Sequence, residues 1–327
     1  EKMPEEVGQR RQKKGIVTAS VLNVRPEPST DKPPVGQLKR GTSVVILRHH
    51  NSWFEIRADG IEGFVYGDYV TVQDDQPTAG FLVDREDLRT IALEPPESER
   101  ITVQPDFSDR QKVAGRTWNR QGGLLEPLSI TIEVEVAATV AVLCVESRGR
   151  GYGPEGRMII RFENHIFWRQ WGRHNQDVFS EHFRFNAKEK WKNHEFRENV
   201  NEGWANFHGN QRREWPVFDF ARALDESAAM RSISMGGPQI MGFNHPSIGF
   251  DSVREMFDAF QSNIRYQILG LFDFLKGPGT TSPMVVALQR KKFTDFASLY
   301  NGPGQAAKYG SLIEDYFELF GALRGAA

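Results

Sequence analysis

The sequence contains very little cysteine: Cys144 is the only one among 327 residues. A disulfide within one chain and a metal site built from cysteines both need at least two, so both are excluded. Cys144 lies inside an apolar run, where we expect a buried thiol with a structural role. The low cysteine content does not exclude an oxidising compartment, because domains of ordinary size fold there without disulfides.

The sequence also lacks long apolar runs and an excess of charge of one sign. No stretch is long and apolar enough to cross a bilayer as a helix. The 41 basic and 43 acidic residues give a net charge of -2, which attracts neither nucleic acid nor an anionic membrane. We therefore expect no nucleic-acid partner and no membrane span. Because the chain begins at Glu1, we expect a fragment or a processed form, and the lack of a signal peptide decides nothing.

Short segments of β-branched and aromatic residues follow a polar start. Residues 1–14 are polar and charged, which predicts a disordered lead-in. Within residues 15–73, runs such as SVVILR, WFEIR and GFVYGDYV are separated by Pro, Gly, Asn and Asp. This pattern predicts short antiparallel strands that form a small barrel. Residues 74–108 mix polar stretches with short apolar pieces, and we expect a linker and connecting segment there.

Residues 15–73 resemble a bacterial SH3 domain. The motifs that carry the likeness are Leu22-Asn23-Val24-Arg25 before a Pro-rich loop, Gly41 before SVVIL, Trp53 with Glu55-Ile56, and Gly63-Phe64-Val65. The resemblance implies a module that docks the chain on the bacterial cell wall. In one interpretation Trp53, Tyr66 and Tyr69 form an aromatic shelf that binds wall peptide. In the other, the module is a spacer or docks another protein.

From Asp109 to the C-terminus the pattern becomes helical. The stretch from Arg110 to Ile132 has apolar residues at helical spacing, with a break expected at Gly122-Gly123. Residues 134–146, VEVAATVAVLCVE, include ten apolar residues, which predicts a helix buried on most sides. It should end at the glycines of SRGRGYG. The predicted fold is a multidomain α+β chain: a small SH3-like β-barrel followed by a mainly α-helical domain over residues 109–327.

Glu146 closes this apolar run and is the candidate catalytic residue. Burial beside Val142, Leu143 and Val145 disfavours the charged carboxylate, and so does the negative end of a helix. Both effects raise the pKa of the carboxyl group, as a general acid that works near neutral pH requires. The residues alone leave open the alternative of a glutamate that points into solvent at a helix end.

Three motifs in order resemble those of lysozyme-like and lytic transglycosylase domains. They are Glu146-Ser147 before a Gly-rich turn, the segment 234–244 with Pro238-Gln239, and Tyr300-Asn301-Gly302. A further segment, Arg161-Phe162-Glu163-Asn164-His165-Ile166-Phe167-Trp168, is similar to one in phage-type N-acetylmuramidase domains. This likeness implies a lysozyme-like fold from near Arg110 to the end. Pro238 and Arg148 depart from the family pattern, which puts the shape of the cleft in doubt.

The resemblance implies hydrolysis of the β-1,4 bond between N-acetylmuramic acid and N-acetylglucosamine, with Glu146 as the acid. Glu163 is the candidate for a second carboxylate; alternatively, Glu163 and His165 form a structural pair beneath the cleft. The distance between two such carboxylates separates a retaining from an inverting mechanism. Without a second carboxylate, the alternative is a lytic transglycosylase, in which the 6-hydroxyl group of the sugar closes a ring.

Six further residues are candidates for binding the glycan: Ser147, Ser234, Gln239, Asn244, Tyr300 and Asn301. Amide groups suit the N-acetyl and hydroxyl groups of the sugars, and a tyrosine suits stacking on a ring. The alternative for each is turn chemistry, because Asn-Gly and Gly-Pro are common turn formers.

We expect no cofactor and no metal site. The scattered histidines, His165, His174, His182, His194 and His208, lack the spacing of a zinc-binding helix. The expected partners are peptidoglycan glycan strands, wall peptide through the SH3-like module, and a phage or contractile injection particle. We expect action in the bacterial cell wall or periplasm, and a secreted autolysin would have the same sequence features. The competing class is a wall-binding protein that cleaves nothing.

Overall fold

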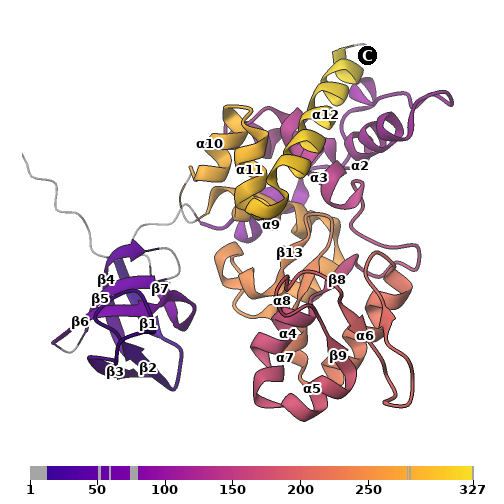
Figure 1. Ribbon diagram of the computed structural model, residues 1–327. Helices are drawn as coiled ribbons and strands as arrows, with labels where there is room; N and C mark the ends of the chain where they lie inside the picture. The colour runs from indigo at the N-terminus through magenta and orange to yellow at the C-terminus, as the bar shows by residue number, and fades with distance from the viewer. Residues whose placement is uncertain are drawn as a thin grey trace, which may run out of the picture. The chain divides into compact units, whose positions relative to one another are not determined.

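The computed structural model describes residues 13–50, 53–58, 60–73, 80–277, 279 and 281–325. The chain divides into two compact units, residues 1–78 and 79–327 (Figure 1). Residues 1–12 of the predicted lead-in and residues 74–79 of the predicted linker lie outside the described residues. Strand β1 begins at Lys13, so the last two residues of the predicted lead-in, 13 and 14, belong to a strand.

The first unit is an antiparallel sheet with a hairpin packed beside it. Its strands are β1 (Lys13–Val17), β2 (Val21–Val24), β3 (Gly36–Lys39), β4 (Ser43–His50), β5 (Trp53–Ala58), β6 (Ile61–Tyr66) and β7 (Val70–Gln73), with a short helix η1 (Gly67–Tyr69). Five of them pair in the order β6-β5-β4-β1-β7, and β2 pairs with β3. Alternate residues such as Val44 and Ile46 are buried, as expected of strands with one face on a core. The predicted small SH3-like sheet is confirmed.

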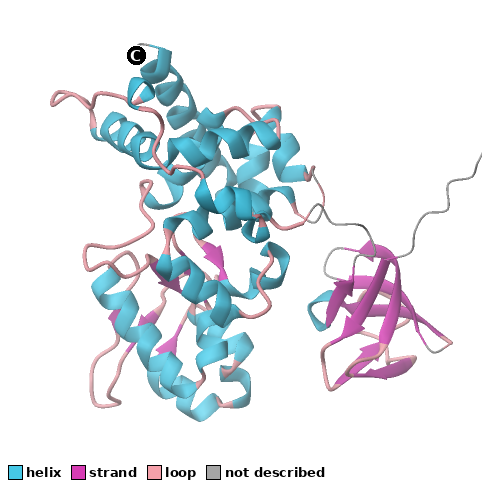
Figure 2. Cartoon of the chain, turned by 180° about the vertical axis from the view of Figure 1, so that it is seen from behind, coloured by secondary structure: helices cyan, strands magenta, loops and turns pink. Residues whose placement is uncertain are grey.

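The second unit is mainly helical. Its elements are η2 (Leu82–Asp84), α1 (Glu86–Thr90), η3 (Glu97–Glu99), α2 (Asp109–Thr131), α3 (Val136–Ser147), β8 (Ile160–Phe162), α4 (Asn164–Gln170), η4 (Gly172–His174), α5 (Gln176–His182), β9 (Phe183–Arg184), β10 (Glu195–Phe196), β11 (Ala205–Asn206), α6 (Gln211–Leu224), α7 (Glu226–Arg231), β12 (Ile233–Met235), β13 (Ile240–Met241), η5 (Gly242–Ile248), α8 (Val253–Ser262), α9 (Ile264–Lys276), α10 (Pro283–Gln289), α11 (Phe293–Tyr300), η6 (Pro303–Gln305) and α12 (Ala306–Gly325). One lobe holds α2, α3 and α9 to α12, and the other holds α4 to α8 with the short strands (Figures 1 and 2). Among the helices described, none is long and apolar enough to cross a membrane.

Helix α3 is the buried helix predicted from the apolar run. It packs between α2 and α12, and every residue from Ala138 to Cys144 is buried. Beside it, the rings of Trp118 on α2 and Phe320 on α12 lie 5.5 Å apart and are fully buried. Burying one such large apolar side chain stabilises a fold by roughly 1.5–3 kcal/mol. The end of α3, which carries Glu146, is therefore held by the core on most sides.

The break expected at Gly122-Gly123 is wrong, because α2 continues through both glycines to Thr131. The glycines serve close packing instead. A Cβ atom on Gly123 would lie 2.3 Å from the carbonyl oxygen of Glu94, and one on Gly122 would lie 2.5 Å from the Trp118 ring. Glycine in a helix costs up to about 1 kcal/mol relative to alanine, and here it allows the segment before α2 to lie against the helix.

A three-stranded antiparallel sheet in the order β13-β12-β8 forms part of the other lobe. Ser234 in β12 pairs with Arg161 in β8 on one side and with Met241 in β13 on the other. Residues 236–239 form the turn between β12 and β13. The sheet therefore places the segment 234–241 next to the segment that contains Glu163.

Residues 80–108 are more ordered than a connecting segment requires. Leu82, Val83 and Leu88 are buried in the core of the helical unit. The buried carboxylate of Asp273 on α9 accepts hydrogen bonds from the backbone N–H groups of Leu82, at 2.9 Å, and Val83, at 3.2 Å. The ammonium group of Lys276 lies 3.3 Å from the same carboxylate. Asp273 therefore anchors the start of this unit to its centre.

We predict that Asp273→Ala destabilises the helical unit by about 3 kcal/mol or more. The change leaves two buried N–H groups without an acceptor and the buried Lys276 without its counter-ion. Thermal unfolding followed by circular dichroism at the helical band measures the effect. The control Asp87→Ala removes an exposed carboxylate paired with Arg85 and should leave the transition unchanged; equal losses in both variants would contradict the anchoring role.

Candidate active site

Glu146 lies in the last turn of α3, and its side chain is half-buried. Its Oε1 atom accepts a hydrogen bond of 2.8 Å from Nδ2 of Asn301, the residue that follows α11. Burial raises the pKa of the Glu146 carboxyl group to about 7, and the hydrogen bond from Asn301 opposes this shift. The Glu146 carboxyl group is therefore partly protonated at neutral pH, whereas an ordinary surface glutamate is fully ionised there.

The chain turns sharply after Glu146. Arg148 adopts the left-handed conformation, with φ of 57°, and its N–H donates to the carbonyl of Cys144. This bond is that of the αL motif that ends many helices, and the N–H of Gly149 donates in addition to the carbonyl of Leu143. Arginine occupies a position that favours glycine, at a cost of about 1–2 kcal/mol. Gly149 itself is pressed against Thr117, where a Cβ atom would lie 1.8 Å from Oγ1.

The turn between β12 and β13 approaches the same helix end. A Cβ atom on Gly237 would lie 3.5 Å from Oγ of Ser147. Gln239 has a positive φ of 55°, and its side chain holds the turn: Oε1 accepts from Ser234 Oγ at 2.9 Å, and Nε2 donates to the Gly236 carbonyl at 2.8 Å. Ser234 and Gln239 thus have the structural role that turn chemistry suggested, and each amide atom of Gln239 keeps capacity for one more partner.

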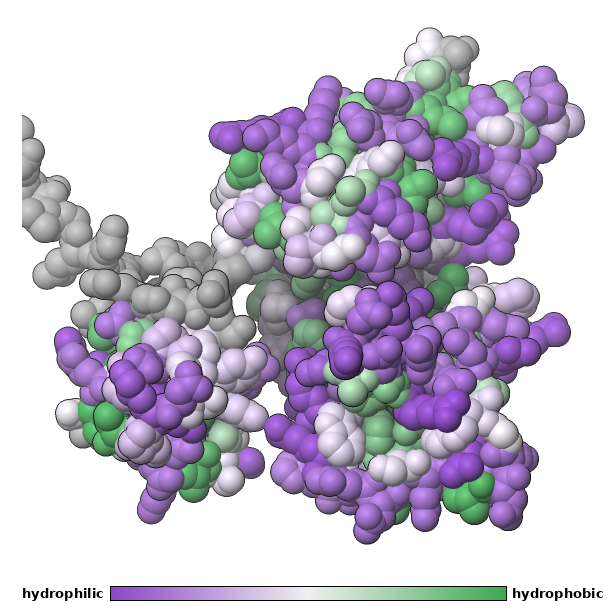
Figure 3. All heavy atoms as spheres, in the orientation of Figure 1, coloured by the Kyte–Doolittle hydropathy of each residue, from purple (hydrophilic) through white to green (hydrophobic). Residues whose placement is uncertain are grey.

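Tyr300 and Asn301 connect the third motif to the other two. The Tyr300 hydroxyl donates to the carbonyl of Pro238 at 2.6 Å, and Asn301 binds Glu146. Burial raises the pKa of Tyr300 well above its usual range, and the nearby Glu146 charge adds to this. The structure therefore brings together the ends of α3 and α11 and the β12–β13 turn. These contacts run between the two lobes, where Figure 3 shows the surface hollowed.

Two of the predicted glycan-binding residues have weaker links to this arrangement. Ser147 is half-buried, and its hydroxyl lies 3.4 Å from the Leu143 carbonyl of its own helix. Asn244 lies on η5, and its carbonyl accepts from Ser247. Within the described part of the chain, no hydrogen bond joins its side chain to Glu146 or Gln239.

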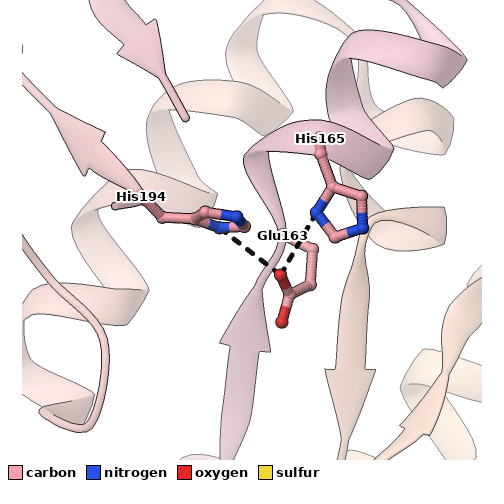
Figure 4. Close-up of side chains that lie close together, drawn as sticks. All are labelled: Glu163, His165 and His194. Atoms are coloured by element: carbon pink, nitrogen blue, oxygen red, sulfur yellow. Dashed lines mark ion pairs between the residues drawn. The ribbon is translucent and has the colours of Figure 1, made fainter. Parts of the chain in front are cut away.

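Glu163 follows β8 and has a different environment from Glu146. Its Oε1 atom lies 2.8 Å from Nε of Arg161, and its Oε2 atom lies 3.4 Å from Nδ1 of both His165 and His194 (Figure 4). Burial alone would raise the pKa of Glu163, but the contact with His165 and the charge of Arg161 outweigh it and lower the pKa to about 2. The carboxylate is therefore ionised at any pH at which a wall hydrolase works. The suggested pair with His165 exists, and His194 joins it.

Sequence reasoning missed two further groups. Glu214 on α6 is fully buried, and burial raises its pKa to about 8 although its Oε2 accepts from the Phe162 N–H at 2.9 Å. A glutamate on the apolar face of a helix is the signal that could have identified it. Tyr309 on α12 is half-buried, and its pKa is raised by burial and by the charge of Glu146. Tyr309 is therefore a further aromatic residue near the candidate acid.

Two surface hollows lie along the loop that follows Glu146. A hollow of about 680 Å³ includes Arg157 and Trp215, whose guanidinium group and indole ring lie 3.5 Å apart. A second, of about 380 Å³, includes Arg150 and Tyr152. Both are lined by Gly153 and Pro154, so the loop separates them, and Glu146 does not line either one.

Comparison with known proteins gives family matches in both units of the chain. A bacterial SH3 domain model matches residues 20–71. A putative N-acetylmuramoyl-L-alanine amidase, YrvJ, of Bacillus subtilis (strain 168) is 36% identical over 70 residues, which are 20% of this chain and 14% of that protein. The chain thus spans about one seventh of the length of that relative.

The crystal structure of Burkholderia AP3 phage endolysin is 27% identical, with 61% of this chain and 70% of that chain covered at a TM-score of 0.46. A model of the N-acetylmuramidase family matches residues 135–320. The match includes Glu146, the β12–β13 turn and Asn301. Because it covers more than half of the chain, the chain belongs to the N-acetylmuramidase family.

Proposed function

We propose that this chain hydrolyses peptidoglycan at the β-1,4 bond between N-acetylmuramic acid and N-acetylglucosamine, with Glu146 as the general acid. The observation that carries the proposal is the half-buried carboxyl group whose pKa lies near 7 and whose position is fixed by Asn301. A group with this pKa is partly protonated at neutral pH and retains driving force for proton transfer. Family membership supports the substrate class.

In the proposed mechanism Glu146 donates its proton to the glycosidic oxygen as the bond to the leaving sugar breaks. The positive charge that develops on the other sugar ring is then quenched by a nucleophile. Asn301 stabilises the carboxylate that remains, because its amide N–H donates to the charged oxygen. The same interaction favours return of the group to the correct position for the next cycle.

The identity of the nucleophile separates two candidate reactions. Among the described residues, burial and Asn301 account for the pKa shift of Glu146, and no second carboxylate contributes. Glu163 is held by Arg161, and we propose that it does not attack the sugar. Water gives a hydrolase; the 6-hydroxyl group of N-acetylmuramic acid would give a lytic transglycosylase. Mass analysis of the products distinguishes them, since the anhydro product is lighter by one water.

We propose that the SH3-like unit docks the chain on the wall. Trp53, Tyr66 and Tyr69 are half-buried and form one ring cluster: Trp53 and Tyr66 have centroids 5.4 Å apart, and Tyr66 and Tyr69 6.2 Å apart. These are the residues expected to form an aromatic shelf for wall peptide. Such a chain would reach the wall by one of three routes: release with a phage, secretion as an autolysin, or delivery by a contractile injection apparatus.

We predict that Glu146→Gln lowers the rate of wall lysis by about 100-fold or more, because glutamine has no proton to donate. The measurement is the turbidity of purified cell walls. Glu135→Gln is the matched control: Glu135 precedes the first residue of the same helix and pairs with Lys291 on the surface. Undiminished lysis by Glu146→Gln, with fold and wall binding retained, would refute the assignment.

The pH dependence of lysis should follow the protonation of Glu146. Its folded-state pKa is raised to about 7, so the active, protonated form predominates below that pH. Above it, we predict that the rate falls by about tenfold per pH unit. Asn301→Ala removes a hydrogen bond to the charged form, so the alkaline limb should move to higher pH. The control Asn199→Ala, in an exposed loop, should leave the limb in place, and a shift of the Asn301 variant to lower pH would contradict this account.

Removal of the Trp53 ring should weaken wall binding. In a full-length Glu146→Gln background, we predict that Trp53→Ala lowers affinity for insoluble peptidoglycan by about tenfold, as loss of a central aromatic contact does. Co-sedimentation measures the bound fraction. Trp191→Ala, which removes an exposed tryptophan of the helical unit, is the control. Equal binding by the Trp53 variant and its parent would favour the spacer role.

A further inference from the structure

Glu163, His165 and His194 come together from two parts of the chain, the start of α4 and the segment before β10. Glu163 follows β8, His165 lies in the first turn of α4, and His194 directly precedes β10. One ligand atom from each, Glu163 Oε2 and both Nδ1 atoms, lies within 4.8 Å of the other two. Figure 4 shows the two rings turned toward the same carboxylate oxygen. We call these residues the Glu163 cluster.

One nitrogen of the His194 ring faces the Glu163 carboxylate with a lone pair. His194 Nε2 lies 2.7 Å from the carbonyl oxygen of Lys190, which only accepts, so Nε2 carries the hydrogen. In a ring that carries its hydrogen on Nε2 alone, Nδ1 presents a lone pair. That lone pair accepts a hydrogen bond of 3.3 Å from the backbone N–H of Asn164, and Nδ1 also lies 3.4 Å from Glu163 Oε2.

The other two ligand atoms of the cluster differ from His194 Nδ1. Glu163 Oε2 and His165 Nδ1 are buried, and within the described residues neither has a hydrogen bond of proper geometry. The opposite oxygen of Glu163 is already bound to Arg161. A carboxylate oxygen and two imidazole nitrogens thus converge in a partly enclosed space. A carboxylate oxygen and an imidazole lone pair that face one another in this way repel unless a proton or a cation lies between them.

We propose that the Glu163 cluster binds one zinc ion through Glu163 Oε2, His165 Nδ1 and His194 Nδ1. Bond lengths of roughly 2.0–2.2 Å and tetrahedral angles place neighbouring zinc ligands about 3.4 Å apart. Both separations from Glu163 Oε2 have this value. Two imidazoles with one carboxylate suit zinc, whereas calcium and magnesium prefer oxygen ligands throughout.

The surroundings resemble the outer shell of a metal site. The N–H of His194 that points away from the cluster is bound to a backbone carbonyl, which fixes the ring with Nδ1 facing Glu163. Arg161 fixes the other carboxylate oxygen. Its positive charge opposes a cation, but the side chain is 43% exposed, so solvent screens it. The His165 side chain is 22% exposed against 0% for His194, so water has access on the His165 side to a fourth position.

The ion would hold in place the long irregular segment between β9 and α6. Between β9 and α6, regular structure is limited to β10 and β11, which have two residues each. His194 lies in this segment, about thirty positions from Glu163. A bond through the metal would tie it to β8 and α4, so the site stabilises the lobe opposite Glu146 and takes no part in proton donation.

The test uses the full-length, tag-free chain after removal of metals with a chelator. Titration with zinc should show one ion per chain, and saturating zinc should raise the melting temperature of the helical unit by roughly 5 °C. Glu163→Gln and His165→Ala should each weaken zinc binding by at least tenfold. His174→Ala, which changes an exposed histidine on η4, should bind zinc as the parent does. Cobalt in place of zinc should give the visible absorption of a tetrahedral site.

Each outcome bears directly on the proposal. Absence of zinc binding by the folded chain, or equal binding by the parent and His165→Ala, would overturn it. Because His165 is partly exposed, its alanine variant should remain folded, and circular dichroism verifies this. Glu146→Gln should bind zinc normally. Loss of lysis without loss of zinc, or the reverse, therefore separates failure of the proposed catalytic role from failure of the metal site.

Discussion

The hydrogen bond from Asn301 to Glu146 joins two helix ends that are 155 positions apart in sequence. Helix α3 is held between α2 and α12, which fixes one end of this bond. The Tyr300 hydroxyl, bound to the Pro238 carbonyl, fixes the other end against the β12–β13 turn. The acid, the residue that tunes its pKa and the turn beside it are thus one connected arrangement, and displacement of any helix would disturb all three.

Three buried or half-buried glutamates show why burial alone does not set a pKa. Burial is the largest cause for each, yet the pKa of Glu146 lies near 7, that of Glu214 near 8 and that of Glu163 near 2. The difference comes from neighbours: one amide for Glu146, backbone N–H groups for Glu214, and Arg161 with His165 for Glu163. Only Glu146 combines a raised pKa with exposure to solvent, which suits it to give up and regain a proton.

Much of the fold follows from local sequence. The apolar run before Glu146 predicts a buried helix because no polar face interrupts it, and the alternating strands predict the SH3-like sheet. The break at Gly122-Gly123 was wrong because the reason for the glycines, contact with residues 92–94, is tertiary. The order of three motifs predicted that Glu146, Gln239 and Tyr300 belong to one region. His194 has no such signal, since its distance from Glu163 in space is set by the folding of a long loop.

The anchoring of Leu82 and Val83 by Asp273 has a practical consequence for chimeric proteins. A side chain from the centre of the helical unit holds Leu82 and Val83 in place at the start of that unit. A different wall-targeting module fused upstream of residue 80 would therefore meet an unchanged boundary. The enzyme could then be directed to another bacterial surface by exchange of the module that precedes residue 80. A fusion point after Val83 would instead remove the two backbone N–H groups that bind the buried Asp273 carboxylate.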